Sequence, residues 1–187
     1  MPSDRGYPLP PDAEAPARSE HTPPAGTSLG NHYDGCFACG SDHADGLHLT
    51  ARAGEGLDVV SYVEVTGAHQ GAPGLAHGGL VATVMDETLG FMLWMLGAPG
   101  VTAKLEVSYR KPVPIRRTVA TRAECTGVAG RKVYGYAEMH QDDLDGPLLA
   151  EASGLFVIVG EEHFRPYLDN VAGEAPARLP GRPRYNP

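Results

Sequence analysis

The stretch from His77 to Leu96, HGGLVATVMDETLGFMLWML, decides the fold of this 187-residue chain. From Gly79 onward it is too long for a typical strand, and only Asp86 and Glu87 interrupt it with charge. A helix that is apolar on all sides has to be buried on most of them. The sequence therefore predicts one long central helix over Gly79 to Leu96.

Segments on both sides of this helix alternate between apolar and polar residues and are rich in β-branched side chains, which is typical of strands. One precedes the helix and four follow it with short turns, so an antiparallel meander is the natural arrangement. One buried helix and an antiparallel sheet that wraps around it give an α+β fold. The expected strands are Leu57 to Thr66, Thr102 to Arg110, Arg117 to Thr126, Lys132 to His140 and Leu148 to Val159.

Both ends of the chain are rich in proline, since eleven of the 17 prolines lie in residues 1–30 or 168–187. Such segments bury too little apolar surface to offset the entropy that is lost on ordering. We therefore expect a folded domain over residues 44–165, a flexible N-terminal segment over residues 1–43 and a flexible tail over residues 166–187. The alternative is a tail that docks against the domain.

The composition excludes several classes of protein. A net charge of −8 argues against general nucleic-acid binding, because duplex affinity comes largely from a basic surface. No apolar run is long enough to span a membrane, and residues 1–30 carry acids and prolines where a secretory signal is apolar, so we expect a cytoplasmic protein. Three cysteines cannot form a framework of several disulfides, so burial must hold the fold together.

The segment before the helix combines a tight loop with a helix start. In QGAPGLAHGG, glycines and a proline mark the loop, and His77, Gly78 and Gly79 begin the helix. A helix N-terminus offers unpaired backbone N–H groups and the positive end of the helix dipole, and glycines let a ligand oxygen come close. This is the outline of an oxyanion site, and a plain glycine turn before a helix is the alternative.

Asp86 stands within the apolar helix. A buried, ionised carboxylate without a partner is strongly destabilising, so such a residue is usually paired or functional. One turn away on either side are Ala82 and Gly90, which leave room beside the carboxylate. Alternatively, Asp86 and Glu87 mark a turn of the helix that faces solvent.

These motifs, in their order and spacing, resemble the hotdog-fold acyl-coenzyme A thioesterases of the PaaI-like, thioesterase superfamily member 4 type. The resemblance lies in HGGLVATVMDETLG, VTAKLEVSYRKPVPI, GRKVYGYAEM and LLAEASGLFVIV, and it covers about residues 36–160. It implies a hotdog fold, hydrolysis of acyl-CoA to free acid and coenzyme A, and no cofactor beyond the coenzyme A of the substrate. It also implies a homodimer with shared active sites, or a dimer of such dimers.

The resemblance further implies roles for single residues. Gly78 corresponds to the residue whose backbone N–H binds the thioester carbonyl, and Gly79 is grouped with it as a candidate. Asp86 corresponds to the carboxylate that acts as base or nucleophile, and Thr102 to the hydroxyl residue that assists it. His77 corresponds to the motif histidine, to which we assign positioning or polarisation of the substrate.

The chemistry agrees with these residue types. Thioester hydrolysis needs a donor where the carbonyl oxygen becomes anionic, and a group that attacks or deprotonates water. Relatives often carry a small residue where this chain has Glu87, which adds a like charge beside Asp86. The only Gly-x-Ser-x-Gly match, GTSLG at Gly26 to Gly30, lies in the proline-rich N-terminal segment without the strand-to-helix context of a catalytic serine, so a serine acyl-enzyme is not expected. A non-catalytic acyl-CoA binding module on the same fold is the alternative function.

Positive charge gathers in the middle of the chain, where eight of the 15 Lys and Arg residues lie between Lys104 and Lys132. Coenzyme A carries a diphosphate and a 3′-phosphate, which Arg and Lys at strand ends are suited to bind. Ordinary solvated strand ends are the alternative. The resemblance places two basic turns near the ligand, and the candidate substrate-binding residues are Arg110, Lys111, Arg131, Lys132 and Gln70.

Cys36 and Cys39 have the spacing of a pair of metal ligands, and three histidines, His32, His43 and His48, lie nearby in the sequence. A zinc site of this kind usually needs a second pair of cysteines. The sequence therefore favours reduced structural thiols and no metal.

The spacing of Gly78 and Asp86 predicts a dimer independently of the resemblance. Eight residues of helix separate the two positions by roughly 12 Å, whereas both groups must come within about 3 Å of one thioester. One chain cannot supply both to the same carbonyl. Two helices that pack antiparallel across a two-fold axis would bring Gly78 of one chain to Asp86 of the other.

Overall fold

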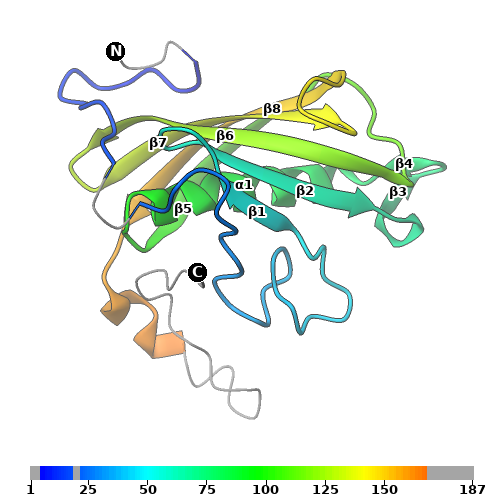
Figure 1. Cartoon of the computed structure of the whole chain (residues 1–187), viewed down its shortest axis with the longest axis horizontal. Helices are drawn as coiled ribbons and strands as arrows, with labels where there is room; N and C mark the ends of the chain where they lie inside the picture. The colour runs from blue at the N-terminus through cyan, green and yellow to red at the C-terminus, as the bar shows by residue number, and fades with distance from the viewer. Residues whose placement is uncertain (1–4, 19–21, 168–187) are drawn as a thin grey trace.

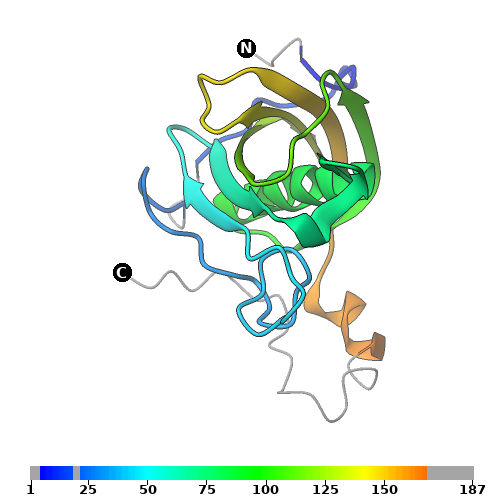
Figure 2. The ribbon, with the colours of Figure 1, turned by 90° about the vertical axis from the view of Figure 1, so that its right-hand side faces the viewer.

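The long apolar helix, α1 (Gly78–Met95), is enclosed by a curved antiparallel sheet (Figure 1), and Figure 2 shows the sheet bending around it. The structure is a computed structural model that describes residues 5–18 and 22–167. A short hairpin of β3 (Gln70–Ala72) and β4 (Leu75–Ala76) precedes the helix. The strands of the main sheet are β1 (Thr50–Ala53), β2 (Val59–Val65), β5 (Gly100–Tyr109), β6 (Arg117–Ala129), β7 (Lys132–Gln141) and β8 (Leu148–Ile158), and the 3-10 helices are η1 (Gly67–His69) and η2 (Glu161–His163).

The predicted α+β architecture, a hotdog fold, is confirmed. The helix begins and ends within one residue of its predicted bounds, because His77 caps its start, and Gly97, with a φ of 68°, and Pro99 follow its end. Strand β1 was not predicted from the sequence. Its four residues, TARA, contain two alanines and only one β-branched side chain, so they give little strand signal. In the described part of the chain, no helix combines the length and hydrophobicity that crossing a membrane requires.

The strand order corrects the expected meander. β6, β7 and β8 are consecutive neighbours, but β5 pairs with β8 and β2 pairs with β6, which gives the order β1-β2-β6-β7-β8-β5. The link from β5 to β6 contains Pro112 and Pro114, which lack the N–H groups that a strand would use. This link runs past the hairpin, where the Ala76 N–H donates to the Val113 carbonyl. β5 stands at the end of the strand order and is therefore an edge strand of the sheet.

Two glycines let the helix come close to the centre of the sheet. Gly135 on β7 and Gly154 on β8 are paired in register. A Cβ at Gly135 would collide with the side chains of Met92 and Leu89, and a Cβ at Gly154 would collide with Phe156 and press on Leu89. Leu89 and Met92 are completely buried, so the missing side chains create the groove into which α1 packs.

The N-terminal segment packs against the domain, which corrects the expectation that residues 1–43 are flexible. Leu29 and Cys39 are only 3% and 6% exposed and belong to the core. The Leu29 N–H donates to the Ala51 carbonyl, and the Thr22 hydroxyl donates to the Met95 carbonyl at the end of α1. The apolar side chains of this segment are spaced irregularly among prolines, so no period in the sequence indicates that it packs. The predicted tail lies, from residue 168 onward, outside the described residues.

Gly135→Ala should lower the free energy of unfolding by about 1–3 kcal/mol, because the added methyl group overpacks the contact with Leu89 and Met92. Urea or thermal denaturation measures this effect. The control is Gly67→Ala, where a Cβ meets nothing within 4 Å and the change should stay within about 0.5 kcal/mol. Equal stability of both variants would contradict the close approach of helix and sheet.

Candidate active site

The start of α1 is capped by its own histidine. His77 is the N-cap residue, and its Nδ1 accepts a hydrogen bond of 2.9 Å from the Gly79 N–H. Because Nδ1 accepts, a neutral His77 carries its proton on Nε2. The Gly79 N–H is thereby committed within the chain. Gly79 was grouped with Gly78 as a candidate donor to the substrate, but in the structure its N–H already has a partner.

Gly78 keeps its backbone donor available. Within residues 5–18 and 22–167 its N–H forms no hydrogen bond, and the residue is exposed. Its carbonyl oxygen accepts a hydrogen bond of 3.0 Å from the hydroxyl of Tyr109, the last residue of β5. Tyr109 was not singled out from the sequence, since an aromatic residue at a strand end carries no specific signal. An unpaired N–H at a helix N-terminus is suited to bind an anionic oxygen.

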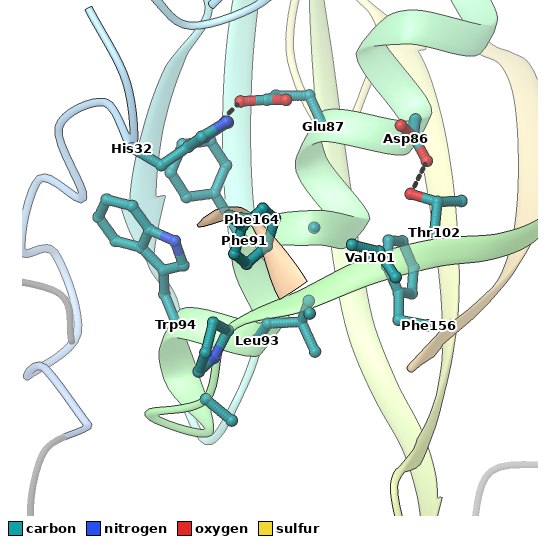
Figure 3. Close-up of a pocket in the computed structure, with 14 residues that line it drawn as sticks. His32, Asp86, Glu87, Phe91, Leu93, Trp94, Val101, Thr102, Phe156 and Phe164 are labelled. Carbon is teal, nitrogen blue, oxygen red and sulfur yellow. Dashed lines mark hydrogen bonds and ion pairs between the residues drawn. The ribbon is translucent and has the colours of Figure 1, made fainter. Parts of the chain in front are cut away.

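Asp86 lies in the middle of α1 and points toward the start of β5 (Figure 3). The Thr102 hydroxyl donates a hydrogen bond of 2.9 Å to Asp86 Oδ1. Burial raises the pKa of Asp86; the bond from Thr102 lowers it and the charge of Glu87 raises it, so that it stays above the ordinary value. A carboxylate in this environment holds a proton more readily than an exposed one does, as a general base must.

A cavity of about 270 Å³ opens beside Asp86 and Thr102. Most of its wall is apolar, so it can hold an apolar group next to the carboxylate. Figure 3 shows side chains from α1, β5 and β8 around it, together with Phe164 from beyond η2. The large apolar lining residues are Phe91, Leu93, Trp94, Val101, Phe156 and Phe164.

Glu87 points away from Asp86, toward the N-terminal segment (Figure 3). Its Oε1 lies 3.2 Å from Nδ1 of His32, and its side chain is 13% exposed. Burial lowers the pKa of His32, but hydrogen bonds with Cys36 and Glu87 outweigh this and raise it to about 10. Asp86 and Glu87 are both partly buried and each carboxylate has a partner of its own, so this turn of the helix does not simply face solvent.

Gly78 and Asp86 lie beside opposite ends of β5. Thr102, at the start of the strand, contacts Asp86, whereas Tyr109, at its end, contacts Gly78. The helix and this edge strand thus run in opposite directions. Within one chain the oxyanion donor and the carboxylate are held apart.

The first basic pair, Arg131 and Lys132, lies at the Asp86 end of the sheet. Lys132 is paired with Val157 of β8, which is paired in turn with Val101 of β5, the neighbour of Thr102. Two strand spacings, about 10 Å, separate the β6–β7 turn from the start of β5. Both side chains are exposed, and neither has an ion-pair partner among the residues that the structure describes.

The second basic pair, Arg110 and Lys111, follows Tyr109 at the Gly78 end. Arg110 forms an ion pair with Glu151, while Lys111 has no such partner in the described ranges. Both residues are exposed. The structure thus brings together neither the two basic pairs nor the two catalytic candidates of one chain.

Gln70 holds the loop before the helix. Its Oε1 accepts a hydrogen bond of 2.8 Å from the Gly74 N–H, and its Nε2 donates to the Gly67 carbonyl. Both ends of the amide are therefore engaged within the chain. The structure places Gln70 in support of the loop instead of free for substrate contact.

The wrapped helix and the residues along β5 define a hotdog-fold protein with a candidate hydrolytic site. Residues 73–147, from the loop before α1 to the start of β8, match the family model described as the thioesterase superfamily. Acyl-coenzyme A thioesterase THEM4 of Mus musculus is 34% identical over 93 residues, which are 50% of this chain and 40% of the mouse protein. The chain thus covers two fifths of the length of this curated relative.

Solved structures show the same fold. The Escherichia coli PaaI protein has 15% identity and a TM-score of 0.57, covering 63% of this chain and 83% of its own. A hypothetical thioesterase of Streptococcus pneumoniae, solved with coenzyme A, has 22% identity and a TM-score of 0.52, covering 55% of this chain and 82% of its own. The resemblance to PaaI-like and THEM4-type thioesterases is therefore confirmed.

Thr102→Val should raise the pKa of Asp86 further, because the hydroxyl that stabilises the carboxylate is lost. Carboxyl NMR titration, with the Asp86 signal assigned from Asp86→Asn, measures the value directly. Ser108→Ala, an exposed hydroxyl on the same strand, should leave it unchanged. A pKa that stays the same or falls in Thr102→Val would show that the bond does not stabilise the anion.

Proposed function

We propose that this protein hydrolyses acyl-CoA thioesters to a free acid and coenzyme A. The observation that carries the proposal is the partly buried carboxylate of Asp86, which stands in a mostly apolar helix, accepts a hydrogen bond from Thr102 and lines the cavity. The name of the mouse relative and the coenzyme A bound to the Streptococcus pneumoniae protein support the choice of substrate. The acyl group would occupy the apolar cavity.

In the proposed reaction Asp86 acts as a general base. It takes a proton from a water molecule whose oxygen attacks the thioester carbonyl carbon, and the Gly78 N–H stabilises the resulting oxyanion. When the C–S bond breaks, the thiolate of coenzyme A leaves and recovers the proton from Asp86. Direct attack by the Asp86 carboxylate, with later hydrolysis of the anhydride, uses the same groups in a different order.

The active site is shared between two chains in this proposal. Gly78 and Asp86 of one chain are roughly 12 Å apart along α1, and β5 presents an exposed strand edge beside both. Antiparallel association along β5 would place Gly78 of the partner subunit opposite Asp86. It would also bring Arg110 and Lys111 of the partner subunit toward Arg131 and Lys132, which together supply cations for the phosphates of coenzyme A.

The cellular setting belongs to the same proposal. None of the three cysteines forms a disulfide, which is the usual state in a reducing compartment. We place the reaction in the cytoplasm, with the homodimer as the catalytic unit and a dimer of dimers as a larger assembly of the same sites.

The test is thiol release from a panel of short-chain, long-chain and aromatic acyl-CoA thioesters. The wild type should hydrolyse at least one of them, and Asp86→Asn should lower kcat by about 100-fold or more at an unchanged melting temperature. Asp58→Asn is the control, because Asp58 is another partly buried carboxylate with a raised pKa, remote from the cavity. Binding without hydrolysis, or full turnover by Asp86→Asn, would refute the proposed mechanism.

Mixing two inactive variants tests the shared site. Gly78→Pro removes the N–H donor, and proline suits this position because it is the first residue of the helix and follows an extended His77. With free subunit exchange, half of the dimers of Gly78→Pro and Asp86→Asn are mixed, each with one intact site, so about a quarter of wild-type activity should return.

Two controls accompany this mixture, one for the role of the N–H group at position 78 and one for subunit exchange. Gly78→Ala keeps the N–H and should remain active, since a Cβ there meets only Tyr109 at 3.5 Å. Mass spectrometry of differently tagged chains establishes that exchange has occurred. Exchange without returning activity would place each site within a single chain.

A further inference from the structure

Four potential metal ligands converge where the N-terminal segment meets α1. They are Nδ1 of His32, Sγ of Cys36, Sγ of Cys39 and a carboxylate oxygen of Glu87, and all lie within 4.8 Å of one another. We propose that these four side chains form a structural zinc site. The site is independent of the proposed thioesterase chemistry, because none of the four acts on the thioester.

The separations between these atoms suit a tetrahedral ion. With Zn–S bonds of about 2.3 Å and Zn–N or Zn–O bonds of about 2.0–2.1 Å, neighbouring ligands should lie about 3.3–3.8 Å apart. His32 Nδ1 lies 3.3 Å from Cys39 Sγ and 3.2 Å from Glu87 Oε1, and Cys36 Sγ lies 3.9 Å from Glu87 Oε1. These three separations differ from the tetrahedral values by a few tenths of an ångström.

The backbone around the cysteines is folded as a tight turn that presents both thiols. The Cys36 N–H donates to the Tyr33 carbonyl, and the Gly40 N–H donates to the Cys36 carbonyl. A side chain at position 40 would collide with the carbonyl groups of Asp34 and Cys36, so the turn requires glycine directly after Cys39. A two-residue spacing between cysteines in such a turn is typical of zinc ligands.

The identity of the fourth ligand explains why the sequence argued against a metal. The neighbouring histidines do not join the cluster, because His48 Nδ1 bonds to the Gly40 carbonyl and the His43 ring packs against Phe37. Glu87 takes their place from a position 48 residues beyond Cys39. A second pair of cysteines is therefore not needed to complete four ligands.

The chemistry of the donors selects zinc and a structural role. Two thiolates and an imidazole suit a borderline-soft ion, whereas magnesium and calcium prefer oxygen ligands. Four protein ligands leave no open position for water or substrate, as in structural sites. Three ligands come from the N-terminal segment and one from α1, so the ion would fasten this segment to the helix one residue after Asp86.

Metal analysis of the full chain, purified under reducing conditions without added chelator, tests the proposal. We expect one zinc per chain in the wild type and its loss in Cys36→Ser and Cys39→Ser. Cys125→Ser removes the remaining cysteine, which lies in β6 outside the cluster, and should keep the metal. Absence of zinc from the wild type even after incubation with excess zinc, or equal zinc in all four proteins, would overturn the site.

A second measurement tests the zinc site even if a cysteine variant fails to fold. Cobalt added to the metal-free wild type should give strong visible bands of tetrahedral coordination and thiolate charge-transfer absorption. Glu87→Gln should weaken zinc binding roughly 100-fold in competition with a chelator, and Glu64→Gln, an exposed glutamate on β2, should not. An octahedral cobalt spectrum, or a Cys36–Cys39 disulfide found by mass in the reduced preparation, would contradict the proposal.

Discussion

The burial of one helix that is apolar on all sides is the constraint on which the rest of the structure depends. Most of the surface of such a helix needs cover, so the sheet curves around it and other segments pack on part of the remaining side. Gly135 and Gly154 allow this curvature at close range, because Leu89 packs where their side chains would be. The N-terminal segment covers part of what the sheet leaves open, and Leu29 belongs to the same core as the helix.

Because the helix is enclosed, each of its two charged residues contacts a different part of the chain. Asp86 and Glu87 are adjacent, yet the helical twist sends them to different surroundings. Asp86 meets the hydroxyl of Thr102 at the edge strand, and Glu87 meets His32 in the N-terminal segment. One turn of helix therefore holds the candidate catalytic carboxylate on one side and the anchor of the N-terminal segment on the other.

The elements that the sequence predicted well are those with a local signal. The length and composition of Gly79 to Leu96 identified the helix, and alternation identified five strands, because both periods are set by neighbouring residues. The strand order was not predicted correctly, since the pairing of β5 with β8 depends on contacts between residues about 50 positions apart. The same limit applies to Glu87, whose contact with His32 spans 55 residues that no local period connects.

In the candidate site too, some side-chain contacts were predicted correctly and others were not. The contact of Thr102 with Asp86, implied by the resemblance, is present in the structure. Gly79 and Gln70 were expected to contact the substrate. Only the folded loop shows that the Gly79 N–H and the Gln70 amide already have partners within the chain. A donor is useful to a substrate only if the fold leaves it unpaired, and residue type does not reveal this. Gly78 differs from Gly79 in that one respect. In the proposed dimer the edge strand that holds Asp86 through Thr102 also holds Gly78 through Tyr109, so pairing of two such edges would assemble both sites in a single step.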